Sequence, residues 1–238
     1  MTLAILADDL TGACDAAAPF ARRGLRTVVV LDLAYPDTSG TSSEGPGAIG
    51  RPAVLAVDAD NRRLGRRLAG SRTGLAARAL REGGATFLYK KIDSTLRGHV
   101  AAELAATLRA WDAPLAVICP AFPAVGRWVQ GGHLFVDKRG DLGDVAELAG
   151  LTGSAGSGTA RTALGRRLAR LGLDVVGHGA DAVAEALERA RRDGAQIVVA
   201  DANTPGHLTA LAAAATRLEP AALLVGSAGL AAALAELQ

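Results

Sequence analysis

Two segments of this chain place charged and hydroxyl-bearing side chains directly after short apolar runs. Residues 7–13 read Ala-Asp-Asp-Leu-Thr-Gly-Ala and follow the run 3–6, and residues 90–98 read Lys-Lys-Ile-Asp-Ser-Thr-Leu-Arg-Gly and follow the run 86–89. Carboxylates can accept hydrogen bonds from hydroxyl groups, hold a cation or take a proton, and lysine and arginine bind carboxylate or phosphate. In a parallel α/β sheet, ligands bind where strands end. We therefore expect the two segments to converge on one anionic ligand.

The adjacent acids Asp8 and Asp9 have two interpretations. Either of them can cap the following helix, since aspartate is a favoured N-cap residue, and Thr11 can do the same. Gly12 permits close approach of the backbone. Two adjacent carboxylates repel each other, however, and a helix cap needs only one. We therefore predict that the pair also contacts hydroxyl groups of a ligand, whereas Asp15 is an ordinary acid of the first helical turn.

The second segment is denser in charge. Lys90 and Lys91 point to opposite faces of a strand, so at least one of them enters a buried layer unless the strand end is a site. Asp93, Ser94 and Arg97 then precede a helix whose free N–H groups favour an anion. A structural ion pair between lysine or arginine and aspartate is the competing interpretation. The number of charged and hydroxyl side chains favours an anion-binding site.

Short apolar runs alternate with amphipathic helical patterns along the rest of the chain. Seven runs are predicted to be strands, at residues 3–6, 27–31, 54–57, 86–89, 115–118, 196–200 and 222–225. They are continuously apolar, which indicates burial on both faces. Residues 99–110 and 182–192 carry apolar side chains at helical spacing. The order of elements predicts an α/β fold with a mostly parallel, doubly wound sheet and helices on both faces.

Two regions interrupt this alternation. Residues 37–50 are rich in glycine, serine and threonine and are expected to form a loop. Residues 126–160 contain the Gly-rich run 150–159 and are expected to be a linker or lid. We therefore predict a first α/β lobe over residues 1–125, which carries the acidic pair and the arginine site, and a second βα lobe over residues 161–238.

Composition and charge argue against several classes of protein. The chain has 26 basic and 24 acidic residues with a net charge of +2, and its arginines are scattered, which disfavours nucleic acid as a partner. No stretch is long and apolar enough to cross a bilayer. Cys14 and Cys119 lack metal-type spacing, and the N-terminus lacks the features of a signal peptide. We expect a cytoplasmic protein with no membrane partner, no metal site and no structural disulfide.

The motifs as a set resemble those of the four-carbon acid sugar kinases, which include threonate, erythronate and 3-oxo-tetronate kinases. The similar motifs are residues 7–13, 60–62 (Asp-Asn-Arg), 90–98, 120–127, 201–204 (Asp-Ala-Asn-Thr) and 226–230 (Gly-Ser-Ala-Gly-Leu). The resemblance implies an ATP-dependent kinase that phosphorylates the terminal hydroxyl group of a small sugar acid. It also implies that ATP and Mg2+ are held by a nucleotide domain that follows the last motif.

The chain ends at Gln238, shortly after that motif, and contains no Gly-x-x-x-x-Gly-Lys-Ser/Thr loop. We therefore expect it to be the substrate-binding portion, which uses ATP and Mg2+ only when a nucleotide domain is supplied by a longer parent chain, a separate subunit or a partner protomer. The sequence also leaves open whether the chain forms a homodimer. The alternatives are a sugar-acid sensor without kinase activity and a cofactor-binding α/β protein unrelated to sugar acids.

The resemblance also implies roles for individual residues of this chain. Asp9 and Asp93 are the catalytic assignments. The implied substrate-binding residues are Asp8, Asp9, Lys91, Asp93, Ser94, Arg97 and Arg127, with the acids on hydroxyl groups and Arg97 on the carboxylate. Ser227 faces the nucleotide in the resembling proteins. A solvated loop arginine is the alternative for Arg127, a helix cap for Ser227, and a turn for Asp201.

Overall fold

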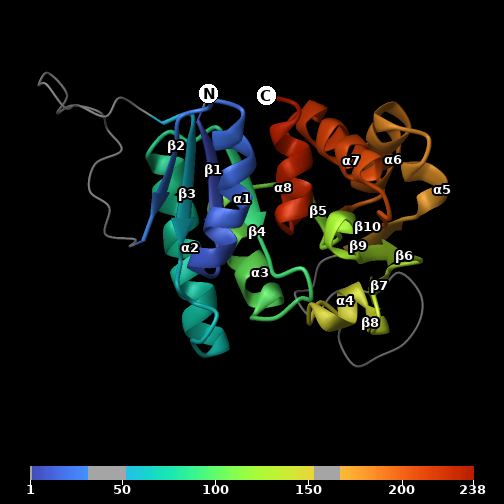
Figure 1. Ribbon diagram of the computed structural model, residues 1–238, viewed down its shortest axis with the longest axis horizontal. Helices are drawn as coiled ribbons and strands as arrows, with labels where there is room; N and C mark the ends of the chain where they lie inside the picture. Colours follow the sequence, from blue (N-terminus) through green and yellow to red (C-terminus); the bar gives the residue numbers. More distant parts are fainter. Residues whose placement is uncertain (1, 32–51, 153–166) are drawn as a thin grey trace, which may run out of the picture.

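The computed structural model describes residues 2–31, 52–152 and 167–238, and an open sheet of eight strands runs through its centre (Figure 1). These strands are β1 (Leu3–Ala7), β2 (Thr27–Val30), β3 (Val54–Asp58), β4 (Phe87–Lys91), β5 (Ala116–Cys119), β9 (Arg167–Leu171), β10 (Ala195–Ala200) and β11 (Leu223–Gly226). Their order is β2-β3-β1-β4-β11-β5-β10-β9, and every neighbouring pair is parallel. The predicted fold class is confirmed.

Helices cover both faces of this sheet. On one face α1 (Leu10–Arg22), α8 (Ala228–Ala235), α7 (Pro205–Arg217) and α6 (Ala180–Arg192) pack in a row. On the other face α2 (Arg66–Glu82) packs along α3 (Val100–Trp111). The two groups lie on opposite faces because their right-handed crossovers move across the sheet in opposite directions. The helices α4 (Val145–Leu148) and α5 (Leu173–Val176) and the 3-10 turn Pro123–Val125 are short.

All seven predicted strands are present, but their arrangement differs from the predicted division into lobes. Strand β11 lies between β4 and β5, so residues 1–125 and 161–238 contribute strands to the same sheet. The predicted boundary at residues 126–160 therefore does not separate two sheets. Strand β9 was not predicted because its sequence, Arg-Leu-Ala-Arg-Leu, places two arginines in an edge strand.

The region predicted as a linker or lid contains a second, smaller sheet. Strands β6 (Arg127–Gln130), β7 (His133–Val136) and β8 (Gly140–Asp144) are antiparallel. The carboxylate of Asp201, after β10, accepts hydrogen bonds from the backbone N–H groups of Gly131 and Gly132 at 2.6 and 2.8 Å. This arm is therefore fastened to the large sheet. The predicted loop 37–50 and most of the Gly-rich run 150–159 lie outside the described residues.

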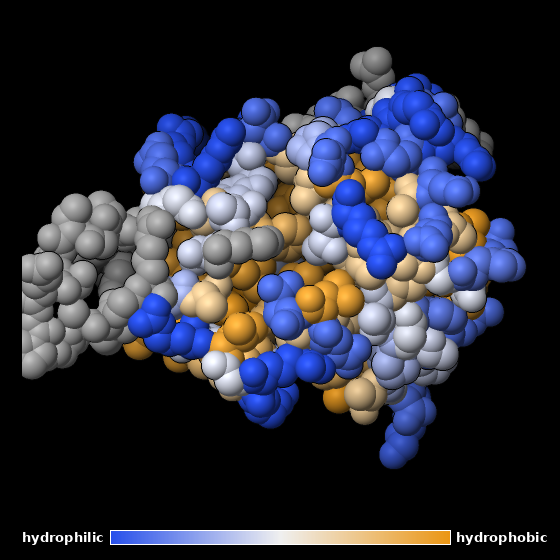
Figure 2. All heavy atoms as spheres, turned by 90° about the horizontal axis from the view of Figure 1, so that it is seen from above, coloured by the Kyte–Doolittle hydropathy of each residue, from blue (hydrophilic) through white to orange (hydrophobic). Residues whose placement is uncertain are grey.

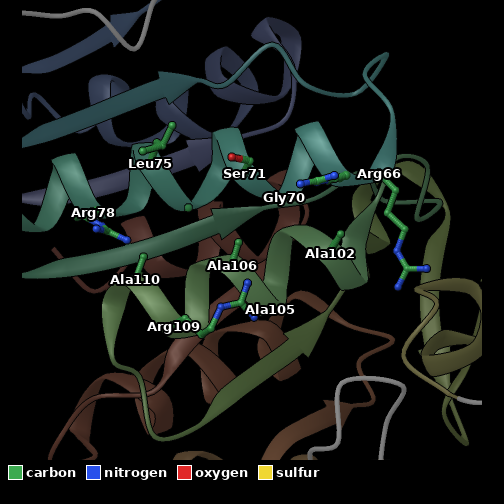
Figure 3. Close-up of a pocket in the computed structure, with 12 residues that line it drawn as sticks. Arg66, Gly70, Ser71, Leu75, Arg78, Ala102, Ala105, Ala106, Arg109 and Ala110 are labelled. Carbon is green, nitrogen blue, oxygen red and sulfur yellow. The ribbon is translucent and has the colours of Figure 1, made fainter.

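Helices α2 and α3 approach each other closely because small residues face each other. A Cβ atom added at Gly70 would lie 3.2 Å from the carbonyl oxygen of Ala102, and one added at Gly74 would lie 3.4 Å from the Cβ of Ala106. The outer side of this contact is a groove lined by several arginines, among them Arg78 (Figure 3). The contact holds α3 against the sheet, where its buried acid can reach β4.

The surface of the described residues is of mixed character. Figure 2 shows, from above, hydrophilic side chains over much of the molecule with apolar side chains in patches between them, which is usual for folded proteins. No helix of the described ranges is long and apolar enough to cross a membrane.

The buried ion pair between Lys90 and Glu103 yields a stability prediction. Both side chains are almost fully buried, and Lys90 Nζ lies 2.8 Å from Glu103 Oε2. Glu103→Gln should lower the free energy of unfolding by about 3–5 kcal/mol, because it leaves a buried ammonium without its anion. Urea unfolding measures this, with Glu185→Gln on the exposed side of α6 as the control. Equal effects of the two substitutions would contradict the assignment.

Candidate functional site

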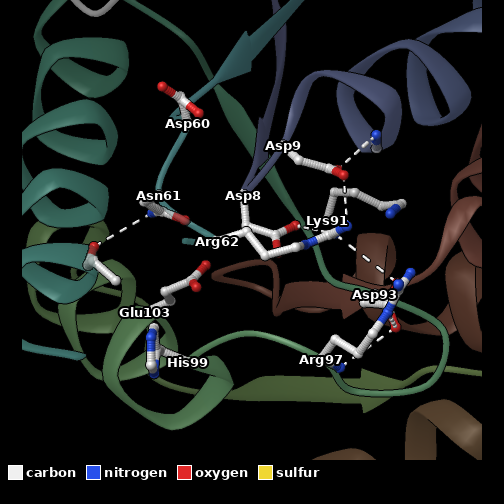
Figure 4. A network of polar contacts seen from close by, with 12 residues as sticks. Asp8, Asp9, Asp60, Asn61, Arg62, Lys91, Asp93, Arg97, His99 and Glu103 are labelled. Atoms are coloured by element: carbon white, nitrogen blue, oxygen red, sulfur yellow. Dashed lines mark hydrogen bonds and ion pairs between the residues drawn. The ribbon is translucent and has the colours of Figure 1, made fainter. Parts of the chain in front are cut away.

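The carboxyl ends of β1, β3 and β4 bring together charged side chains from three parts of the chain. These strands are neighbours, with Leu6 in register with both Val57 and Lys90. Asp8 and Asp9 follow β1, Arg62 follows β3, and the segment 90–98 includes the end of β4. Arg62 Nη2 lies 4.0 Å from Asp93 Oδ1, so the two segments lie together as expected (Figure 4).

Arg62 is the side chain that joins the two adjacent acids. Its Nε and Nη2 donate to Asp8 Oδ2 and Oδ1 at 2.6 and 2.9 Å, and its Nη1 donates to Asp9 Oδ2. The planar guanidinium group offers this fork geometry, which a lysine cannot reproduce. Sequence reasoning gave Arg62 no role. The signal that could have found it is its position after β3, at the same sheet edge as the acids.

Asp8 and Asp9 differ in what they can still do. Asp8 is buried, and both its oxygens accept from Arg62. Asp9 is the N-cap of α1, because its Oδ1 accepts from the backbone N–H of Gly12 at 2.8 Å. The cap interpretation therefore holds for Asp9, and Thr11, the alternative cap, does not have this role. The side chain of Asp9 keeps an exposed fraction of 28%, so it is the acid of the pair that a ligand can reach.

The two lysines at the end of β4 point to opposite faces, as strand alternation predicts, and both are buried. Lys90 pairs with Glu103 on the α3 side. The side chain of Lys91 points toward α1, and its ammonium group has no hydrogen bond or ion pair with any of the described residues. Burial lowers the pKa of Lys91, and the charges of Asp8 and Asp9 oppose this shift.

Asp93 and Arg97 form an ion pair within one turn of chain. Asp93 Oδ1 accepts from Arg97 Nη2 at 2.7 Å and Oδ2 accepts from Arg97 Nε at 3.0 Å. Burial works to raise the pKa of Asp93, but hydrogen bonds from Arg97 and Thr95 outweigh it and hold the pKa well below its usual range. The side chain of Arg97 is 70% exposed. Helix α3 begins at Val100, close to the predicted start at residue 99, and the segment 93–97 precedes it as expected.

Arg127 belongs to this site and is not the solvated loop arginine of the alternative interpretation. It begins β6, and its Nη1 donates to the hydroxyl group of Ser94, which is buried. Its Nε is buried without a partner among the described residues. The antiparallel arm therefore brings a further cation to the end of β4.

Other candidate residues have structural roles. Ser227 is buried, caps α8 by accepting from the N–H of Gly229, and donates to the carbonyl oxygen of Ala121. Its cap interpretation thus matches the structure. Asp201 holds the turn between β6 and β7. Cys119 is a buried core residue, whereas Cys14 is exposed.

The described residues contain no group of three His, Cys, Asp or Glu side chains placed to hold a metal ion. Asp8, Asp9 and Asp93 already bind Arg62 or Arg97. What the cluster can offer a ligand is a partly exposed carboxylate, a buried ammonium and two arginines, which together suit a small anion that bears hydroxyl groups.

A family model described as a sugar-binding N-terminal domain matches residues 3–234. The D-threonate kinase of Cupriavidus necator is 41% identical over 239 residues, which cover 99% of this chain and 54% of that protein. The 3-oxo-tetronate kinase of the same organism is 32% identical over a match that covers 98% of this chain and 54% of that protein. The chain thus spans about half the length of the curated relatives it matches.

A solved structure from Bordetella bronchiseptica, described as a domain-swapped dimer with bound citrate, is also similar. It is 36% identical, covers 100% of this chain and 56% of that one, and gives a TM-score of 0.74. Together these similarities contradict the interpretation as a cofactor-binding protein unrelated to sugar acids.

Asp93 should make the stability of the fold depend on pH in acid. Its pKa is lower in the folded than in the unfolded protein, so its carboxylate stabilises the fold above the unfolded pKa of about 3.9. This contribution is lost as the pH falls through the folded pKa. Asp93→Asn should lower the free energy of unfolding at pH 7 and flatten its decline between about pH 5 and pH 2. Urea unfolding at several pH values measures both effects. With Asp15→Asn as the control, unchanged pH dependence in Asp93→Asn would contradict the assignment.

Proposed function

We propose that this chain is the acid-binding part of a kinase for four-carbon sugar acids. The chain belongs to the family of sugar-binding N-terminal domains. The substrate is an acid of the threonate, erythronate or 3-oxo-tetronate type, and the reaction transfers a phosphoryl group to its terminal hydroxyl. The names of the relatives support this substrate class. The citrate described with the relative from Bordetella bronchiseptica is likewise a hydroxy acid.

The observation that carries the proposal is the set of hydroxyl acceptors and cations at the ends of β1 and β4. Asp9 is partly exposed and can accept hydrogen bonds from substrate hydroxyl groups. Lys91, Arg97 and Arg127 lie around the same strand ends and can neutralise a carboxylate. Such charge-assisted hydrogen bonds give both affinity and orientation. Asp8, Asp93 and Ser94 complete the proposed binding residues and hold these groups in place.

Of the two proposed catalytic acids, Asp93 is poorly suited to accept a proton. Asp93 has a pKa well below its usual range because of its bonds to Arg97 and Thr95, so it is a weak base at neutral pH. Asp9 is the better candidate to contact the attacking hydroxyl group. Phosphoryl transfer depends mainly on positioning and on neutralising charge. We therefore assign Asp9 to positioning the hydroxyl group and Asp93 to holding Arg97.

The phosphoryl donor comes from outside the described residues in this proposal. Ser227, the candidate nucleotide contact, is buried as a helix cap among these residues. We propose that Mg2+-ATP is brought by a nucleotide domain in the same parent protein, in a separate subunit or in a partner protomer. The domain-swapped dimer described for the relative from Bordetella bronchiseptica supports a homodimer.

The same observations favour a second function, that of a sugar-acid sensor without kinase activity. The cluster for an acid is built entirely from described residues, whereas no group of three metal-ligating side chains is found among them. Supplying the nucleotide half of the Cupriavidus necator D-threonate kinase separates the two functions. Turnover of ATP in the mixture with D-threonate is expected of the kinase part. Acid binding without any turnover in that mixture would favour the sensor.

Calorimetry with D-threonate tests the proposed site. The chain should bind D-threonate in the absence of ATP. Asp9→Asn should weaken binding by about 1.5–3 kcal/mol, because it removes a charged acceptor of hydroxyl hydrogen bonds. Asparagine still caps a helix, so α1 should persist. Asp15→Asn, on the exposed side of α1, should leave the affinity unchanged. Equal affinities for all three proteins would remove Asp9 from the site, and no binding to the wild type would overturn the proposed function.

A further inference from the structure

The side chain of Lys91 lies beneath the first turn of α1, and the absence of a side chain at Gly12 makes room for it. A Cβ atom added at Gly12 would lie 2.9 Å from Lys91 Nζ and 2.6 Å from Asp9 Oδ1. Figure 4 shows Lys91 beside the start of α1 with no contact drawn to its ammonium group. The residue is only 5% exposed. The residue is therefore almost fully covered by protein, and its charged end lies against Gly12.

Lys91 differs from the other cations of the cluster because it lacks a partner. Arg62 binds Asp8 and Asp9, Lys90 binds Glu103, and Arg97 binds Asp93. Within residues 2–31, 52–152 and 167–238, no acceptor bonds to Lys91 Nζ. A buried ammonium without an anion is costly, so the fold would not be expected to keep it without a use.

The first turn of α1 adds further positive potential at the same place. The helix has 13 residues, and the N–H groups of Gly12 and Ala13 are taken by Asp9. The N–H groups of Leu10 and Thr11 have no partner among the described residues. Free N–H groups and the helix dipole favour an anion at an N-terminus. The buried ammonium is an independent sign that an anion belongs here.

We propose that Lys91 and the first turn of α1 form the subsite for the carboxylate group of the sugar acid. This rests on the proposed function. Lys91 Nζ lies at the buried end of the cluster, beside the first turn of α1. The opposite end of the acid then points toward Arg97, whose side chain is 70% exposed. A phosphoryl donor can reach a terminal hydroxyl only at such an open end. The carboxylate therefore meets Lys91, which differs from the expectation from the sequence that it meets Arg97.

The acids close to Lys91 do not prevent this. Asp8 and Asp9 would repel a substrate carboxylate if they were free, but Arg62 binds both of them. Their charge is therefore largely compensated before a ligand arrives. The ammonium group of Lys91 is left to the ligand.

Calorimetry with D-threonate and its neutral amide separates a carboxylate subsite from other roles. Lys91→Met should weaken D-threonate binding at least about 30-fold, because a desolvated charge pair is lost. It should leave affinity for the amide within about threefold, since no full charge pair is involved there. Lys91→Arg should keep part of the acid preference. Arg97→Ala should weaken D-threonate binding by less than about tenfold, because its side chain is exposed.

Two further measurements keep the proposal falsifiable if the amide binds too weakly to measure. Lys91→Met should raise the urea midpoint of the free protein, because it removes an unpaired buried charge. Gly12→Ala should weaken D-threonate binding while the charge of Lys91 is kept, because the added methyl group displaces both Lys91 Nζ and Asp9 Oδ1. A lower midpoint for Lys91→Met, or unchanged binding by Gly12→Ala, would overturn the proposal.

The remaining outcomes distinguish other sources of the anion. If Arg97→Ala no longer binds D-threonate more tightly than the amide, while Lys91→Met still does, the carboxylate is bound by Arg97 and the proposal is overturned. Loss of inorganic phosphate binding in Lys91→Met, with acid binding unchanged, would mean that the subsite holds the phosphoryl group and would overturn the proposal. If the wild type binds no D-threonate, the proposed function itself fails.

Discussion

The bond between Arg62 and the adjacent acids Asp8 and Asp9 is the constraint on which the site depends. Two carboxylates next to each other at the end of a buried strand repel, and Asp8 has almost no contact with water. One guanidinium group accommodates both acids because its donors spread in a plane. It also comes within 4.0 Å of Asp93. The end of β1 is thereby joined to the segment that follows β4.

Pairing of charges then decides which groups remain available to a ligand. Lys90 is committed to Glu103, and Arg97 to Asp93. Each pair neutralises its own charges, and the pair between Lys90 and Glu103 does so in the buried interior. Lys91 and the partly exposed Asp9 are left beside the first turn of α1. Most charged side chains of the cluster are therefore paired with one another, and only a few stay available to a ligand.

The topology explains why residues far apart in sequence share this site. Placing β11 between β4 and β5 brings the last strand of the chain to the middle of the sheet, where Tyr89 donates to the carbonyl oxygen of Ser227. The antiparallel arm β6-β7-β8 crosses to the same end and delivers Arg127 to Ser94. Asp201 holds that arm through two backbone N–H groups. Its carboxylate therefore contributes to the site indirectly.

Local patterns in the sequence determined the elements: seven apolar runs became parallel strands, and the charged segments after β1 and β4 lie at one sheet edge. These follow from short-range rules of burial and alternation. Only the tertiary structure decided that Arg62 joins the acids, that Asp9 and not Thr11 caps α1, and that Arg97 is tied to Asp93 while Lys91 stays unpaired among the described residues. Partner choice depends on distances between strands whose order the chain does not reveal, so residue types alone could not assign it.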